Sequence, residues 1–353
     1  MFTFSLASHL LFFLVLLLVS ASISLFLIKR TRIMDIPNGR SSHKKPTPTI
    51  GGIAIVVTFF LSMLILYLFA GRTMISEHFF LGFTFSSLLI ASMSLYDDVK
   101  KKPFYIRLVT HVIAVLVVMA FGIIIHRVDF PHDLPLFTNR SLGILGYFIT
   151  FWWILGMINA YNFMDGLNGM AGGNAIIAAS FFCIITYIQG SNFAYMVSYT
   201  LVSGVAGFLI FNFPRGKLFM GDIGSTFLGF TFATLPIIAS LYDNAHTSLL
   251  VIPLLLFHFI YDTCFTLLRR LFKGENIFQA HRTHLYQLFN RLGFTHFKVT
   301  VFYWAVAILQ GLGALWMITI PGPMRLMVFL PYLIFQMVYT IIVVYHARKG
   351  GLL

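Results

Sequence analysis

Charged side chains are scarce in this sequence. Only 10% of the 353 residues are Asp, Glu, Lys or Arg, whereas 59% are hydrophobic and Phe alone occurs 40 times. A soluble globular domain carries about 25% charged residues. The composition therefore excludes a soluble enzyme or binding module. It indicates an all-α polytopic membrane protein, in which lipid is the solvent for the apolar surface.

Cysteine and acidic residues are also few. The two cysteines, Cys183 and Cys264, both lie in apolar runs, which excludes a disulfide framework and a structural zinc site. Asp and Glu together number 11 against 24 Lys and Arg, so the formal net charge is +13. In a soluble protein such a charge suggests nucleic acid. In a membrane protein it is explained by basic cytoplasmic loops, so we expect no nucleic-acid partner.

Long apolar runs are abundant. We delimit eleven windows of about 20 residues, the length that spans the hydrocarbon core of a bilayer. They cover residues 6–28, 50–70, 79–96, 104–126, 141–160, 171–189, 193–213, 223–241, 248–271, 298–320 and 326–346. The first window lacks a preceding basic region and is followed by Lys29, Arg30 and Arg32. We therefore interpret it as a transmembrane helix rather than a cleaved signal peptide.

The basic residues are distributed unevenly between the segments that join these windows. Of the 24 Lys and Arg, 20 fall in segments on the same side of the membrane as the C-terminus. Four fall on the side of the N-terminus, at 72, 127, 140 and 325. The positive-inside rule then predicts about eleven transmembrane helices with a periplasmic N-terminus and a cytoplasmic C-terminus. No linker or repeat divides the chain, so we expect one domain over 1–353, with its polar segments at the cytoplasmic face.

The stretch from Asn159 to Gly173 carries polar residues between two apolar windows. Asn162, Asp165 and Asn168 follow one another at steps of three and share one face if the stretch is helical. An acid at the mouth of a membrane helix is costly unless it meets water, a metal or a cation. The stretch is thus a candidate site, although a capped helix start with a polar turn explains the same residues.

Two further acidic motifs occur on the same side. Asp97 and Asp98 precede three lysines, and adjacent carboxylates can hold a divalent cation or act as a base. A solvated, self-paired charge cluster is the alternative. Asp222, between Gly221 and Gly224, opens the window 223–241, where backbone N–H groups favour phosphate. An N-cap is the alternative there. Mg²⁺ prefers carboxylate oxygens together with substrate phosphates, a role that would suit Asp222 with an amide oxygen nearby.

The remaining polar segments are basic. His281, Arg282 and His284 follow the ninth window without acidic or thiolate co-ligands, which favours anionic phosphate over zinc. Lipid headgroups could also occupy such a loop. His43 lies in a Pro- and Gly-rich basic turn at 40–52. Asp262, inside the ninth window, is a functional candidate or a buried acid paired to a neighbouring helix.

Five segments, in this order, resemble the polyprenyl-phosphate N-acetylhexosamine-1-phosphate transferases, the WecA and MraY superfamily of family 4 glycosyltransferases. They are SSHKKPTPTIGG (41–52), DD (97–98), NAYNFMDGLNG (159–169), FMGDIGS (219–225) and AHRTHLYQ (280–287). The resemblance extends from about residue 40 to 293 and is closest to the WbpL-type branch. This sequence departs from WecA- and MraY-like members in having Asn168 in place of Asp. It also has Tyr286 and Gln287 after His284, in place of a pattern closer to HxHH.

The resemblance implies a role for each matching residue. Asp222 would bind Mg²⁺, with Mn²⁺ as a substitute, and Asn162 would be a second ligand or its support. Asp97, Asp98 and Asp165 would form the catalytic cluster, with Asp98 as the base for the lipid phosphate. The residues implied in substrate binding are His43 and Arg107 among the cationic groups, Asn168 and Phe219 at the nucleobase, and His281, Arg282 and His284 at the diphosphate.

The resemblance also implies an activity. The protein would transfer the 1-phosphate of GlcNAc, or of a deoxy sugar such as FucNAc or QuiNAc, from a UDP-sugar to undecaprenyl phosphate, releasing UMP. This step initiates O-antigen (lipopolysaccharide) or cell-wall glycan synthesis at the bacterial inner membrane, and a homodimer is compatible with it. The alternative is a multi-pass transporter or flippase for a lipid-linked or anionic solute. That class predicts polar residues at mid-membrane and paired repeats; apart from Asp262 and His258 the sequence has neither.

Overall fold

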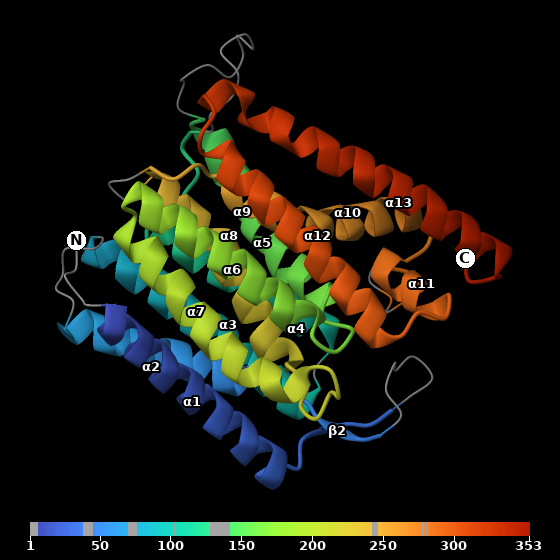
Figure 1. The fold of residues 1–353 in the computed structure, drawn as a ribbon, viewed down its shortest axis with the longest axis horizontal. Coiled ribbons are helices and arrows are strands. Elements are labelled where there is room, and N and C mark those ends of the chain that lie inside the picture. The colour runs from blue at the N-terminus through green and yellow to red at the C-terminus, as the bar shows by residue number, and fades with distance from the viewer. Residues whose placement is uncertain are drawn as a thin grey trace.

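The computed structural model describes residues 6–37, 45–69, 76–101, 103–127, 142–241, 246–276, 279 and 281–353. These residues form a bundle of helices with a two-stranded sheet at one end (Figure 1). The elements are α1 (Leu6–Arg30), β1 (Met34–Asp35), β2 (Thr47–Pro48), α2 (Gly52–Phe69), α3 (Glu77–Lys100), α4 (Phe104–Ala120), α5 (Ile144–Phe163), α6 (Met170–Gln189), α7 (Asn192–Asn212), α8 (Gly221–Leu241), α9 (Val251–Leu255), α10 (Phe257–Phe272), α11 (Leu285–Arg291), α12 (His296–Met317), the 3₁₀ helix η1 (Gly322–Val328) and α13 (Phe329–Lys349).

The predicted helical class is confirmed for the part of the chain that the structure describes. Every one of the eleven apolar windows contains helix. Nine helical segments among the described residues are long and apolar enough to cross a bilayer. The other two windows differ because α4 has only 17 residues and because the window 248–271 is divided at Leu256 into α9 and α10. The number of spans and their orientation stay predictions.

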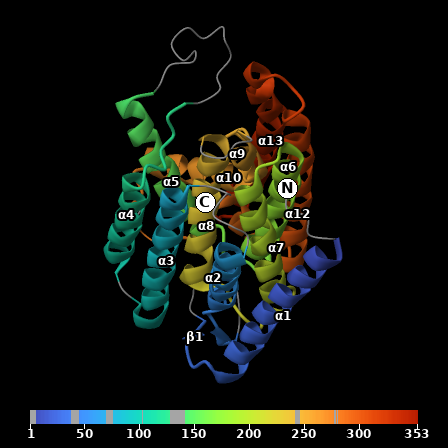
Figure 2. The ribbon, with the colours of Figure 1, turned by 90° about the vertical axis from the view of Figure 1, so that its left-hand side faces the viewer.

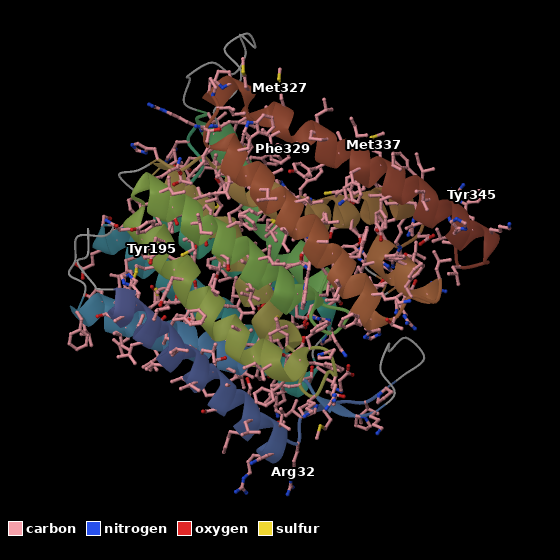
Figure 3. All side chains as sticks on the ribbon, in the orientation of Figure 1. Arg32, Tyr195, Met327, Phe329, Met337 and Tyr345 are labelled. Atoms are coloured by element: carbon pink, nitrogen blue, oxygen red, sulfur yellow. The ribbon has the colours of Figure 1, made fainter. Side chains whose placement is uncertain are left out.

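Helix α8 is the centre of the bundle. It packs against α2, α3 and α5, and 94% of its most apolar stretch is buried. The helices α1 and α13 lie at the edges, and only 22% of the corresponding stretch is buried in each. Met337 and Tyr345 of α13 point away from the rest of the molecule (Figure 3). Apolar side chains that face outward in this way suit lipid rather than water.

Helix α10 lies at an angle to the long helices (Figure 1) and is amphipathic. Its buried face carries polar side chains at a spacing of four, which places them in one row; they are His258, Asp262, Thr266 and Arg270. Its outer face is apolar, with Leu268, Leu271 and Phe272 exposed. The polar row is therefore turned into the protein, where its partners come from neighbouring elements.

The start of α8 is bonded to the segment that precedes α2. Strand β2 pairs with β1 at the lower end of the bundle (Figure 2). Beyond it, Phe219 N donates to Pro48 O over 2.7 Å, and Gly51 N donates to Phe219 O over 2.8 Å. Gly221 follows with φ +74°, and a Cβ there would lie 2.1 Å from the Thr49 carbonyl oxygen, so only glycine fits.

Candidate active site

The carboxylate of Asp98 is directed at the first turn of α8. Its Oδ1 accepts a hydrogen bond from Asp222 N over 3.0 Å, and its Oδ2 accepts one from Ile223 N over 2.9 Å. The first N–H groups of a helix have no partner within the helix and carry a partial positive charge, so a carboxylate stabilises them. Asp98 thus fixes the position of the turn that carries Asp222.

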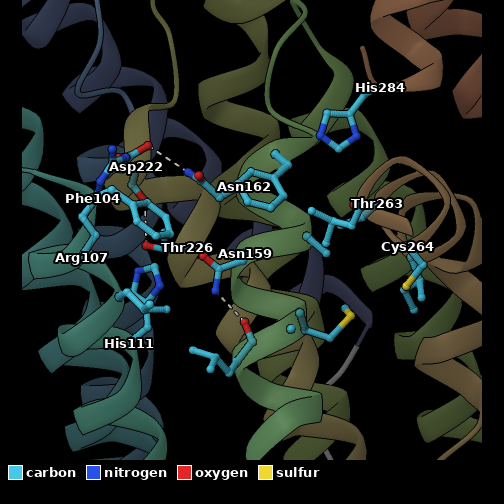
Figure 4. A pocket seen from close by; sticks show the side chains of 18 of the residues that line it. Phe104, Arg107, His111, Asn159, Asn162, Asp222, Thr226, Thr263, Cys264 and His284 are labelled. Carbon is cyan, nitrogen blue, oxygen red and sulfur yellow. Dashed lines mark hydrogen bonds and ion pairs between the residues drawn. The ribbon is translucent and has the colours of Figure 1, made fainter. Parts of the chain in front are cut away.

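Arg107 of α4 lies between two carboxylates from different helices. Its Nη1 donates to Asp222 Oδ2 over 2.6 Å, and its Nε lies 3.2 Å from Asp97 Oδ2. On the other side, Asn162 Nδ2 donates to Asp222 Oδ1 over 2.8 Å and to Ser225 Oγ over 2.9 Å. Four helices, α3, α4, α5 and α8, therefore meet at Asp222 (Figure 4).

Asp165 lies in the loop between α5 and α6, close enough to Asp222 for the two charges to interact. Burial raises the pKa of the Asp165 carboxyl to about 7, and the negative charge of Asp222 adds to the increase. The charge of Asp222 thus disfavours the ionised form of Asp165, and a bound cation would reverse this effect.

The donor set around Asp222 fits a magnesium ion that is completed by substrate. Among the described residues no group of three or more His, Cys, Asp or Glu side chains is arranged to hold a metal. Mg²⁺ does not require such a cage, since it is commonly held by one or two protein oxygens, several waters and substrate phosphates. Asp222 offers a carboxylate, and Asn162 offers its amide oxygen, because Nδ2 is already used in hydrogen bonds. The residues therefore fit Mg²⁺, and the same oxygen donors suit Mn²⁺.

A cavity of about 720 Å³ opens from this cluster. Its walls come from α4, α5, α8, α10 and the loop before α11 (Figure 4). Polar side chains gather at one end, where Asp222, Asn162 and His284 lie. The rest of the wall is largely apolar and includes Trp152 and Leu267. One cavity thus joins a charged region to an apolar one.

The loop before α11 places two histidines at the cavity. The rings of His281 and His284 stack with their centroids 4.9 Å apart. Thr283 N donates to His281 Nδ1 over 3.3 Å, so a neutral His281 carries its proton on Nε2. Burial, with smaller contributions from the neighbouring His284, Arg270 and Arg269, lowers the pKa of His281 to about 4. At neutral pH His281 is therefore an uncharged hydrogen-bond donor.

Comparison with known proteins identifies the family. The sequence model described as glycosyl transferase family 4 matches residues 80–240. A phospho-N-acetylmuramoyl-pentapeptide-transferase from Staphylococcus carnosus is 30% identical over 79% of this chain and 88% of its own length. The chain belongs to glycosyl transferase family 4. A probable undecaprenyl-phosphate N-acetylglucosaminyl 1-phosphate transferase from Bacillus subtilis is 28% identical over 76% of this chain and 74% of its own length. The predicted membership of the polyprenyl-phosphate N-acetylhexosamine-1-phosphate transferase superfamily is thereby confirmed, whereas the WbpL-type branch stays a prediction.

In this family 4 protein the cavity collects five of the predicted site residues: Arg107, Asn162, Asp222, His281 and His284. Asp97 lines a small adjoining cavity, and Asp98 faces α8. Asp165, Phe219 and Arg282 are half-buried and do not line the large cavity, and Asn168 donates to Pro214 O over 3.1 Å near the surface. His43 lies outside the described residues.

His111 and Asn159 are polar residues at the cavity to which the sequence analysis assigned no role. His111 of α4 is only 5% exposed and bonds to Asn159 of α5. Asn159 Nδ2 also donates to Leu155 O over 2.8 Å. The Nδ1 atom of His111 has no hydrogen-bond partner among the described residues. The signal was present, because His111 follows Arg107 by one helical turn within an apolar window.

Proposed function

We propose that this protein is a polyprenyl-phosphate N-acetylhexosamine-1-phosphate transferase. The observation that carries the proposal is the shape of the cavity, in which carboxylates, arginine and histidines at one end continue into an apolar wall. A lipid phosphate needs both environments at once. The names of the relatives, which include undecaprenyl phosphate and a phosphorylated amino sugar, support the same substrates.

In the proposed reaction an oxygen of the lipid phosphate attacks the β-phosphorus of the UDP-sugar. The bond between that phosphorus and the bridging oxygen breaks, and UMP leaves with the electron pair. Both reactants are anionic, so the main task is to hold them in line and to screen their charge. Mg²⁺ held by Asp222 and Asn162 would supply part of the screening.

The protein's own side chains would supply the rest of the charge screening. Arg107 is placed to contact the lipid phosphate, because it lines the cavity beside Asp222. His281 offers a neutral N–H donor for the diphosphate, with His284 stacked on it. A phosphate monoester is mostly ionised at neutral pH, so a strong base is not required. We therefore assign Asp98 a positioning role through α8, and we keep Asp97 and Asp165 as members of the charged cluster.

The finer assignments follow the sequence. We propose UDP-GlcNAc or a UDP-linked deoxy-N-acetylhexosamine as donor and undecaprenyl phosphate as acceptor. We place the charged end of the cavity at the cytoplasmic face of the bacterial inner membrane, because 20 of the 24 basic residues fall on that side. The product would begin a lipid-linked surface glycan, either O-antigen or cell wall.

Release of UMP tests the proposal. Purified protein with undecaprenyl phosphate, Mg²⁺ and a panel of UDP-N-acetylhexosamines should release UMP with at least one sugar. The release should stop with EDTA and resume when Mg²⁺ is restored in excess. Folded protein that releases no UMP with any sugar would contradict the proposal and favour a transporter, which an uptake assay in vesicles would then detect.

The apolar wall can be tested separately through Cys264, an exposed α10 residue that lines the cavity. Cys264→Trp fills part of the apolar region, so the KM for undecaprenyl phosphate should rise roughly tenfold. The KM for the UDP-sugar should stay within about twofold, since the charged end is untouched.

The matched control is Leu268→Trp, one turn further along α10, where the side chain is exposed but does not line the cavity. It should leave both constants unchanged. If the two variants behave alike, the polyprenyl chain does not use this wall.

A further inference from the structure

Asp262 is an ionisable residue that the proposed chemistry does not use. It lies on the polar row of α10 and is only 1% exposed. A buried carboxylate is unfavourable unless donors surround it. The structure supplies those donors from four places along the chain.

Two of the donors belong to the backbone of α11. Leu285 N donates to Asp262 Oδ1 over 2.9 Å, and Tyr286 N donates to Asp262 Oδ2 over 3.1 Å. Both oxygens are therefore tied to the first turn of a helix that is 23 and 24 residues further along the chain. This pair of bonds fixes where the preceding loop ends.

A third donor is the ring of His284, whose Nδ1 lies 3.1 Å from Asp262 Oδ1. Since Nδ1 faces the carboxylate, Nε2 is the ring nitrogen that can reach a ligand in the cavity. The stacking of His281 on His284 extends this constraint to the second histidine. Asp262 thereby sets the orientation of both rings that line the cavity.

The remaining donors anchor the carboxylate itself. Thr266 Oγ1, one turn along α10, donates to Oδ1 over 3.1 Å, and Tyr303 OH of α12 donates to Oδ2 over 3.3 Å. Neither residue belongs to the loop. The carboxylate is thus held by the helical frame on one side and holds the loop on the other.

We propose that Asp262 is the positioning residue of the His281–His284 loop and determines its affinity for the diphosphate of a nucleotide substrate. This inference rests on the proposed function of the site. Because Nδ1–H of His284 donates to the carboxylate, Nε2 can donate to a phosphate oxygen only when both ring nitrogens carry a proton, and the adjacent carboxylate compensates that positive charge. An amide in place of the carboxylate keeps the shape but loses the charge, and its NH₂ group opposes the N–H donors of α11.

The test compares Asp262→Asn with the wild-type protein for binding of UDP and of UMP in the presence of Mg²⁺. UDP carries the β-phosphate that the loop would contact, and UMP lacks it. We expect the Kd for UDP to rise by about 10- to 100-fold and the Kd for UMP to stay within about threefold. Equal weakening of both nucleotides, or an unchanged Kd for UDP, would overturn the inference.

Matched variants separate positioning from general destabilisation. Thr186→Val removes the hydroxyl of another buried helical threonine, which donates to carbonyl groups of its own helix α6, so both nucleotides should bind within about threefold of wild type. In a His284→Ala background, Asp262→Asn should weaken UDP binding less than it does in the wild-type background, because the route through the ring is gone and only the bonds to α11 remain. A full additive loss would contradict the coupling.

Folding and function failures remain distinguishable. If Asp262→Asn does not yield monodisperse protein, Asp262→Glu keeps the charge but shifts the oxygens by one methylene, and it should also weaken UDP selectively. Wild-type affinity for UDP in Asp262→Glu would then overturn the inference. Wild-type protein that neither binds UDP nor releases UMP would overturn the proposed function and this inference together, whereas UDP binding that survives in Asp262→Asn overturns the inference alone.

Discussion

Asp222→Asn is expected to lower kcat for UMP release by about a thousandfold while the protein still folds. The amide keeps the volume and can still accept from Arg107 through its oxygen. It loses the negative charge that a divalent cation requires in a site where only two protein oxygens are offered. The expected loss is therefore in catalysis rather than in stability, because Asp98 still holds the first turn of α8.

The measurement is UMP release at saturating substrates, with Mg²⁺ varied over several decades. Higher Mg²⁺ should restore little activity, because the ligand itself is missing. Glu77→Gln is the matched acid-to-amide control, since Glu77 opens α3 at the end opposite to Asp98 and accepts a hydrogen bond from Tyr67 OH over 3.0 Å. Turnover by Asp222→Asn within tenfold of wild type would remove Asp222 from the metal site.

Arg107→Gln is expected to reduce kcat by about a hundredfold. Arg107 bridges Asp97 and Asp222. Asp98 and Asp165 lie close to Asp222, so the substitution leaves four acidic side chains near one another without the guanidinium. Repulsion from the four acids would disfavour entry of an anionic phosphate. The KM for undecaprenyl phosphate should therefore rise together with the loss of kcat.

Arg107→Lys sharpens this experiment. A lysine keeps the charge but cannot present two nitrogens to two carboxylates, so its kcat should fall between those of wild type and Arg107→Gln. Lys298→Gln removes one positive charge from an exposed position on α12 and should have no effect. If Arg107→Lys equals Arg107→Gln, geometry outweighs charge at this position; wild-type activity in both would show that the bridge is not used.

The sequence predicted the helices well because each window is apolar throughout, and a backbone in lipid must satisfy its own hydrogen bonds. It could not predict the break at Leu256, because the apolar run 248–257 continues across it. The polar row of α10 was visible as Asp262 and His258. The sequence did not show which way this row faces, because its partners lie on α12 and on the loop before α11, which follow later in the chain.

The candidate site was predictable in its membership and less so in its contacts. Asn162 and Asp222 were paired from their motifs, and the structure joins them by a hydrogen bond of 2.8 Å. The hydrogen bond from Asp222 N to Asp98 joins residues that are 124 positions apart. It depends on how α3 packs against α8, which no local sequence pattern encodes. His111 was missed because a single histidine in an apolar helix has no motif around it. The catalytic and binding roles of these residues stay predictions.

The bonds that join Pro48 and Gly51 to Phe219 have a consequence for biogenesis. A ribosome that feeds this chain into the membrane releases the segment before α2 long before residue 219 emerges, and contacts of such sequence separation form late. Throughout that interval Pro48 O and Gly51 N lack the partners that Phe219 later provides. The charged cluster around Asp222 therefore cannot form before α8 is inserted, and the cavity is completed only when α10 and the loop before α11 follow.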